Sequence, residues 1–200
     1  YKNFSLPIGV TWDTRDSTVN ATRGFYIDAE AKPWSGLGST QSGMRLTADA
    51  RAYHGFGEDD RFVLAGRLQL GAIYGADLLG APRNYLFYSG GGGTVRGQPF
   101  QSLGVNLLRD AQDTSIGGRF FAGSSIEARV RITETIGIVG FADIGSIGIS
   151  DFGDGDWHAG AGIGIRYFTG FGPIRLDIAA PAGGDTGDGV QLYVGLGQAF

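Results

Sequence analysis

The sequence predicts an all-β fold, an antiparallel transmembrane β-barrel of which this chain forms the carboxyl-terminal portion. The 200 residues include 37 glycines, 13 phenylalanines and 8 tyrosines, which favour many strands and tight turns over a helical core. Mean hydropathy is -0.02. No apolar run approaches the length of about 20 residues that a transmembrane helix needs, whereas a barrel strand carries only a weak signal. The absence of cysteine excludes a disulfide framework.

Nine segments show the alternation of apolar and polar residues that is typical of strands. They cover residues 4–13, 23–34, 42–54, 61–76, 118–131, 136–145, 157–168, 172–180 and 189–200. In the third segment Met44 and Leu46 fall on one face, and Arg45 and Asp49 on the other. Because no helical pattern competes, each segment is predicted to be a strand.

The polar faces of these strands carry charges of both signs. They comprise Asp28, Glu30, Lys32, Arg45, Asp49, Arg51, Arg67, Glu127, Arg129, Arg131, Asp143, Arg175 and Asp177. The polar face of a soluble β-sandwich meets bulk water and needs no matching of signs, whereas a shared polar lumen does. The pattern therefore favours a barrel over a sandwich.

The connections between the segments alternate in length. Those near 14–22, 55–60, 132–135 and 169–171 are short, and those at 77–117 and 146–156 are long. Bacterial barrels place short turns in the periplasm and long loops outside. Nine antiparallel strands cannot close a barrel, and an open edge in lipid leaves backbone groups unpaired, so we expect upstream strands to complete about sixteen. Tyr1 follows no export signal, so the chain is expected to be mature, truncated or both.

Seven aromatic residues fall near predicted strand ends, where membrane barrels carry interfacial girdles. They are Trp12, Trp34, Tyr53, Tyr74, Trp157, Tyr167 and Phe168. In a soluble protein the same residues would instead plug a core.

Other kinds of site are disfavoured by spacing. The glycine run 90–93 is not followed by the Gly-Lys-Ser/Thr and helix of a phosphate loop. Asp151, Asp154 and Asp156 miss the EF-hand spacing, so a solvated loop is favoured over a calcium site. We predict no catalytic residue, no metal site and no cofactor.

The remaining polar residues indicate neither an enzyme nor a nucleic-acid-binding protein. His54 and His158 are the only histidines, and neither accompanies a nucleophile motif or a zinc-ligand pattern. Positive and negative charges are interleaved along the strands, so no basic patch is expected. Gly160, Gly162 and Gly164 alternate along a strand, where they allow close approach, bending or space in the lumen.

Several motifs together resemble one protein family. They are Thr94-Val95-Arg96-Gly97, Phe141-Ala142-Asp143-Ile144-Gly145, the stretch from Gly160 to Tyr167, Gly172-Pro173-Ile174-Arg175-Leu176-Asp177, Asp13-Thr14-Arg15-Asp16 and Ala21-Thr22-Arg23-Gly24. Across nearly the whole chain they resemble the bacterial surface antigen family of outer-membrane assembly proteins, the BamA/TamA superfamily. The short loops and the Gly172–Asp177 strand are closer to the TamA type.

The resemblance implies that the loop at about 77–117 folds back into the lumen. Its Val95-Arg96-Gly97 motif would then meet the strand motif of Phe141, Asp143 and Gly145, with Arg96 in contact with Asp143. The physical chemistry agrees, since Asp143 falls on the polar face of its strand and a guanidinium can bond a carboxylate in bidentate fashion. The family's usual aromatic residue directly after Val-Arg-Gly is replaced here by Gln98-Pro99.

The resemblance also implies a terminal strand, about 189–200, that forms one side of a weak seam. Tyr193, Gly195 and the final Phe200 resemble a signal read by the assembly machinery, with Gln198 in place of an expected apolar residue. The implied function is insertion or translocation of other outer-membrane proteins, such as autotransporters, in the outer membrane of a Gram-negative bacterium or a related organelle. The implied partners are the bilayer, client β-barrel proteins and a periplasmic or inner-membrane protein, TamB-like for the TamA type.

Two alternatives share the predicted barrel. The first is a two-partner secretion pore, which would conduct ions steadily and export one dedicated substrate. The second is a barrel that anchors an upstream lipase-like enzyme. Nothing within these 200 residues separates the three functions.

Overall fold

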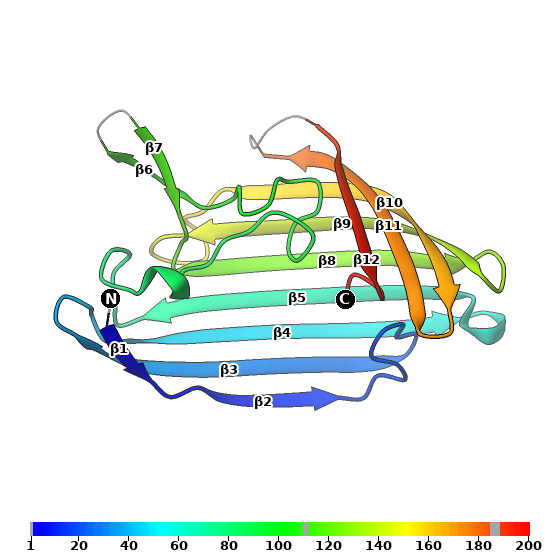
Figure 1. Ribbon diagram of the computed structural model, residues 1–200, viewed down its shortest axis with the longest axis horizontal. Coiled ribbons are helices and arrows are strands. Elements are labelled where there is room, and N and C mark those ends of the chain that lie inside the picture. Colours follow the sequence, from blue (N-terminus) through cyan, green and yellow to red (C-terminus); the bar gives the residue numbers. More distant parts are fainter. Residues whose placement is uncertain (1, 110–111, 185–188) are drawn as a thin grey trace.

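The protein is a curved antiparallel sheet whose inner face is crossed by one long loop (Figure 1). The computed structural model describes residues 2–109, 112–184 and 189–200. Within these residues ten strands form the main sheet: β1 (Lys2–Ser5), β2 (Ile8–Asp13), β3 (Gly24–Leu37), β4 (Gly43–Phe56), β5 (Phe62–Tyr74), β8 (Phe120–Arg131), β9 (Ile136–Gly148), β10 (Trp157–Thr169), β11 (Gly172–Gly183) and β12 (Gln191–Leu196). The predicted all-β antiparallel fold is confirmed.

Neighbouring strands are mostly consecutive in the chain. The order across the sheet is β1-β3-β4-β5-β8-β9-β10-β11-β12, with β2 also paired to β3. Within the described part of the chain the sheet is not closed, because β12 lies at one edge and β1 and β2 lie at the other. Its two edges therefore carry backbone groups without a strand partner.

The segment predicted as one strand at 4–13 forms two short strands. Both β1 and β2 pair with β3, but Leu6 and Pro7 interrupt the ladder between them. Pro7 has no backbone N–H to donate, and opposite this break Leu6 N donates 3.1 Å to the carbonyl of Pro33. The interruption at Pro7 accounts for the difference from the prediction.

The long connection between β5 and β8 contains structure that the sequence pattern did not predict. It includes a short 3-10 turn, η2 (Arg83–Tyr85), and a hairpin of β6 (Val105–Arg109) and β7 (Gln112–Ile116). A second 3-10 turn, η1 (Glu58–Asp60), lies between β4 and β5. The loop segment before β6 lies over the concave side of the sheet in Figure 1. An isolated bridge from Phe87 to Gly118 joins it to the residues just before β8, and a second from Ser89 to Leu103 closes the loop on itself.

The two faces of the sheet differ in polarity, as the alternation predicts. On the convex face apolar side chains stay exposed, with Ile163 and Val194 each 71 % accessible. On the concave face charged side chains are buried, including Glu127, Asp143 and Asp177. An apolar outer surface around a polar interior is the arrangement of a membrane barrel wall.

The aromatic residues near strand ends divide between these faces. Trp12, Tyr74, Trp157 and Tyr167 are exposed on the outer face. The prediction of a girdle position was wrong for three others, which face inward: Trp34 and Tyr53 are buried, and Arg131 stacks on Phe168 with its guanidinium 5.1 Å from the ring centre. Each of these three residues lies on the same face of its strand as the polar residue two positions before it. Alternation along the strand therefore predicts which face they occupy, whereas nearness to a strand end does not.

The last strand is shorter than predicted. β12 ends at Leu196, and residues 197–200 turn into the interior, so the C-terminal label in Figure 1 lies over the middle of the sheet. Gly197 adopts a φ of +83°, which favours glycine, and donates its N–H to the carbonyl of Pro173 at 2.7 Å. Phe200 is buried against Ala21, Tyr53 and Ala65. The prediction that Phe200 ends the terminal strand was therefore wrong.

The connections gather at two ends of the sheet. Residues 14–23, 57–61, 132–135 and 170–171 lie at one end, here called the short-turn end, and 38–42, 75–86 and 149–156 lie at the other. No described helix is both long and apolar enough to cross a membrane. The assignment of the first end to the periplasm stays a prediction.

Candidate functional site

The glycine-rich segment before Arg96 forms a tight, internally bonded turn. Gly90, Gly91 and Gly97 have φ values of +98°, +90° and +93°, which residues with a side chain rarely adopt. Gly91 N donates to the carbonyls of Val95 and Gln98 at 3.1 and 3.0 Å. This turn presents the Arg96 side chain to the sheet.

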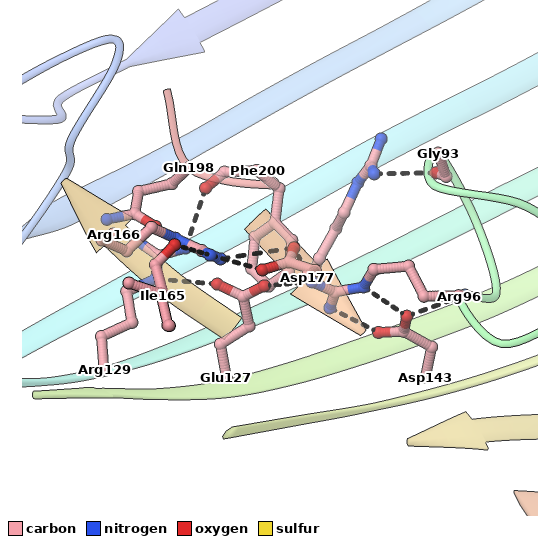
Figure 2. Close-up of polar contacts among 11 residues, drawn as sticks. Gly93, Arg96, Glu127, Arg129, Asp143, Ile165, Arg166, Asp177, Gln198 and Phe200 are labelled. Atoms are coloured by element: carbon pink, nitrogen blue, oxygen red, sulfur yellow. Dashed lines mark hydrogen bonds and ion pairs between the residues drawn. The ribbon is translucent and has the colours of Figure 1, made fainter. Parts of the chain in front are cut away.

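Arg96 and Asp143 are joined by three hydrogen bonds (Figure 2). The backbone N and Nε of Arg96 donate to Asp143 Oδ2 at 3.0 and 2.7 Å, and Nη2 donates to Oδ1 at 2.9 Å. Arg96 is only 2 % exposed, so this bidentate pair is desolvated. The structure brings together the loop motif and the strand motif that the sequence analysis singled out.

Two further groups contact the Arg96 guanidinium. Glu127 Oε1 accepts a hydrogen bond from Arg96 Nη1 at 2.6 Å, and the Phe141 ring lies 3.6 Å below the guanidinium carbon. Burial opposes the charged form of Arg96, but hydrogen bonds and charges from Asp143 and Glu127 outweigh it and raise the pKa of Arg96. Arg96 therefore stays a cation in the lumen.

Glycines of the wall make room for the loop. A Cβ at Gly160 would lie 1.7 Å from the Arg96 carbonyl oxygen, and one at Gly145 would lie 2.9 Å from Val95 Cγ2. A Cβ at Gly97 would meet the carbonyl oxygen of Ala180 at 2.4 Å. Gly145 and Gly160 therefore let the loop backbone approach the sheet closely. Val95 then packs on β9 at Gly145, and Gly97 packs on β11 at Ala180.

Residues after the arginine attach the loop to the last strands of the sheet. The Tyr193 hydroxyl on β12 accepts a hydrogen bond from Gly97 N at 3.0 Å and donates one to the Gln98 carbonyl at 3.4 Å. Gln98 Nε2 donates to the Ala159 carbonyl at 3.0 Å. Gln98, which stands where the family resemblance leads one to expect an aromatic residue, therefore bonds the wall directly.

The charged side chains continue beyond Arg96 toward the short-turn end. Arg129 Nε donates to the second oxygen of Glu127 at 2.8 Å, and Arg166 is bonded to Asp177. Asp177 Oδ2 also lies 3.6 Å from Arg96 Nη1. Alternation predicted that Glu127, Arg129 and Asp177 face the lumen, but it did not predict the contacts of Glu127 and Asp177 with Arg96, and it did not single out Arg166.

The terminal residues predicted as a seam signal lie in different surroundings. Tyr193 and Gly195 are on the inner face of β12, whereas Phe200 is in the interior, 6.5 Å from Tyr53 between ring centres. No described residues gather three or more metal-ligating carboxylate or histidine groups. The arrangement is a set of buried ion pairs that fixes a loop to a wall.

The whole chain, residues 1–200, matches the Omp85 superfamily domain. The chain belongs to the Omp85 superfamily. The predicted resemblance is confirmed at this level, while the TamA type stays a prediction. Membership places this Omp85 domain in the outer membrane of Gram-negative bacteria, as predicted.

One solved structure supports the fold of this Omp85 domain. The chain is similar to BamA from Haemophilus ducreyi, in a crystal structure lacking POTRA domains 1–3, with a TM-score of 0.79 and 18 % sequence identity. The match covers 96 % of this chain and 41 % of that chain, so the Omp85 domain described here spans less than half of that BamA chain.

Proposed function

We propose that this Omp85 domain is the carboxyl-terminal part of a barrel that inserts or exports other outer-membrane proteins, such as autotransporters, and that it performs no covalent chemistry. The single observation that carries the proposal is the match of the whole chain to the Omp85 superfamily domain. Its partners would be the bilayer, client β-barrel proteins and a periplasmic or inner-membrane protein, TamB-like if the barrel is of the TamA type.

The edge strand β12 supports this proposal. β12 has 6 residues, whereas its neighbour β11 has 12, and the two pair only from Ile174 to Ala179. The far side of β12 has no strand partner among the described residues. An incoming strand could add there through backbone hydrogen bonds. Gly195 contributes no side chain to packing with such a strand, which keeps the added pairing weak and reversible.

The contacts that hold the loop against the sheet supply the second part of the proposed mechanism. Arg96, Asp143 and Glu127 fix the loop to β8 and β9, while Tyr193 fixes it to β12. The loop therefore braces the wall next to the edge at which a client strand would add. We propose that Val95, Arg96 and Gly97, with Phe141, Asp143 and Gly145, are the residues that hold the barrel in a form competent for assembly.

Client assembly by reconstituted protein tests the proposal. The natural full-length protein that carries this domain is placed in liposomes with an unfolded client barrel, and folding is followed by the heat-dependent shift of the client on a gel. Arg96→Ala should slow folding about tenfold or more, the factor that corresponds to 1.4 kcal/mol. Arg83→Ala is the matched control, because Arg83 lies on the same long loop, is exposed and has no ion pair among the described contacts.

The alternatives give different results. A parent protein that never accelerates client folding would overturn the proposal. Steady ion conductance with export of one dedicated substrate would instead indicate a two-partner secretion pore. Ester hydrolysis by the full-length protein that survives loss of Arg96 would indicate an anchored enzyme.

A further inference from the structure

Residues 197–200, here called the inturned segment, are bound in the lumen by two arginines. We infer that Arg129 and Arg166 form a binding site for this segment, and that the loop arginine Arg96 holds both of them in position. Figure 2 shows Arg129 and Arg166 near Gln198 and Phe200, with Arg96 entering the same cluster of charges from the loop. This site positions the inturned segment, and it could exist whether or not the protein assembles client barrels.

The first connection runs through Glu127. Its Oε1 accepts from Arg96 Nη1 at 2.6 Å, and its Oε2 accepts from Arg129 Nε at 2.8 Å. Arg129 Nη2 then donates to the Phe200 carbonyl at 3.0 Å, and its guanidinium carbon lies 5.5 Å from the centre of the Phe200 ring. One carboxylate thus joins the loop arginine to the arginine that binds Phe200.

The second connection runs through Asp177. Its carboxylate is bonded to Arg166 and lies 3.6 Å from Arg96 Nη1. Arg166 Nε donates to Gln198 Oε1 at 2.7 Å. Gln198 is held further by the turn 14–23, since its Nε2 donates to Asn20 Oδ1 at 2.9 Å and its backbone N to the Val19 carbonyl at 3.0 Å.

Burial explains why these contacts depend on one another. Glu127 and Asp177 are 0 % exposed and Arg166 is 1 % exposed, so none of these charges can be solvated by bulk water in place of its partner. Removal of Arg96 leaves each carboxylate with one close arginine instead of two. The remaining arginines are then free to move toward the unbalanced carboxylates and away from Gln198 and Phe200.

The position of the inturned segment sets the length of the edge strand. Gly197 N still bonds the Pro173 carbonyl, but Gln198 and Phe200 bond lumen groups and do not extend β12. Release of the segment would let backbone from 198 to 200 leave the lumen. The state of the Arg96 loop is thereby coupled to the free edge of the sheet.

A single cysteine reports on this coupling without any client. The chain has no cysteine, so Ala199→Cys places one thiol in the partly buried segment of the natural full-length protein, after replacement of any cysteine outside this domain. A water-soluble maleimide should label it slowly in the parent. Arg129→Gln, Arg166→Gln and Arg96→Ala should each raise the labelling rate about tenfold or more. Arg83→Gln, at an exposed arginine on the same loop as Arg96 with no ion pair among the described contacts, should leave the rate unchanged.

A further variant tests the site without removing a charge, because the loss of a buried charge could prevent the barrel from folding. Gly164→Ala keeps every charge, but its Cβ would lie 1.9 Å from Asp177 Oδ1 and 2.7 Å from Arg166 Nη1, so it should displace that pair and raise labelling. Unchanged labelling in Arg129→Gln, Arg166→Gln and Gly164→Ala would overturn the site. Faster labelling in those three but not in Arg96→Ala would overturn the coupling to the loop. Neither result depends on client folding, so the proposed function is judged separately.

Discussion

The backbone N–H and the guanidinium of Arg96 both bond the carboxylate of Asp143, across 47 residues of sequence. A side chain held in this way fixes the position of its own loop backbone as well as its charge. Because both partners are buried, loss of Arg96 leaves the Asp143 carboxylate without a described cationic partner, at a typical cost of about 3–5 kcal/mol, whereas loss of Asp143 leaves Arg96 bonded to Glu127.

Substitutions of this pair should be strongly coupled. Arg96→Ala and Asp143→Asn should each loosen the loop, and the double variant should lose much less than the sum of the two. We expect a coupling energy within the range of about 0.5–3 kcal/mol that contacting residues show. The rate of proteolysis in the 77–117 loop is to be measured in the parent, the two single variants and the double variant. Fully additive effects would show that the two residues act independently.

Gly160→Ala should displace the loop although it removes no polar group. The added methyl would lie 1.7 Å from the Arg96 carbonyl oxygen, a backbone atom that can move only with the loop. The expected result is faster proteolysis of the loop and slower client folding. Gly140→Ala on β9 is the matched control, since a Cβ there meets nothing within 4 Å. Equal behaviour of the two alanine variants would contradict the close packing at Gly160.

Tyr193→Phe separates two roles of this residue. It removes the hydroxyl that accepts from Gly97 N and should leave that N–H unpaired, at a cost of about 1–3 kcal/mol. If Tyr193 holds the loop, the variant should insert normally but show faster loop proteolysis. Tyr167→Phe, on the exposed outer face, is the control. Reduced membrane insertion with an unchanged loop would instead favour a role as a terminal signal.

The short-turn end should weaken in acid. Arg23 bonds Asp60 through Nε and Nη2 at 2.9 and 2.7 Å, and this contact, with a hydrogen bond from Thr22, holds the pKa of Asp60 below its ordinary value of 3.8. A depressed folded-state pKa stabilises the fold in full above about pH 4, and the contribution is lost as the pH falls through the folded-state pKa.

Thermal unfolding between pH 2.5 and pH 6 measures this effect. The melting temperature of the parent should fall more steeply below about pH 4 than that of Asp60→Asn, which has no carboxyl to titrate. Glu58→Gln, on the same short turn and with no ion pair among the described contacts, provides the control. Identical pH profiles for the parent and Asp60→Asn would exclude a contribution from this pair.

The strand faces and the family could both be predicted from the amino-acid sequence. Alternation is a local property of extended backbone, so Glu127, Asp143 and Asp177 could be placed on the inner face without knowledge of their neighbours. The family resemblance of the motifs around Arg96 and Asp143 then implied which loop and strand meet. The same alternation puts Tyr53 on the polar face with Arg45 and Asp49, and Trp34 on the polar face of its own strand, in conflict with the girdle position predicted from their nearness to strand ends.

The contacts between side chains inside the curved sheet could not be predicted from the sequence pattern and became visible in the folded structure. Arg129 contacts Phe200 across 71 residues and Arg166 contacts Gln198 across 32, and no local pattern encodes these distances. The inward turn at Gly197 depends on the turn 14–23 and on two buried arginines that receive it. The physical reason is that alternation fixes the side of each residue, whereas register and sheet curvature fix its partner across the lumen.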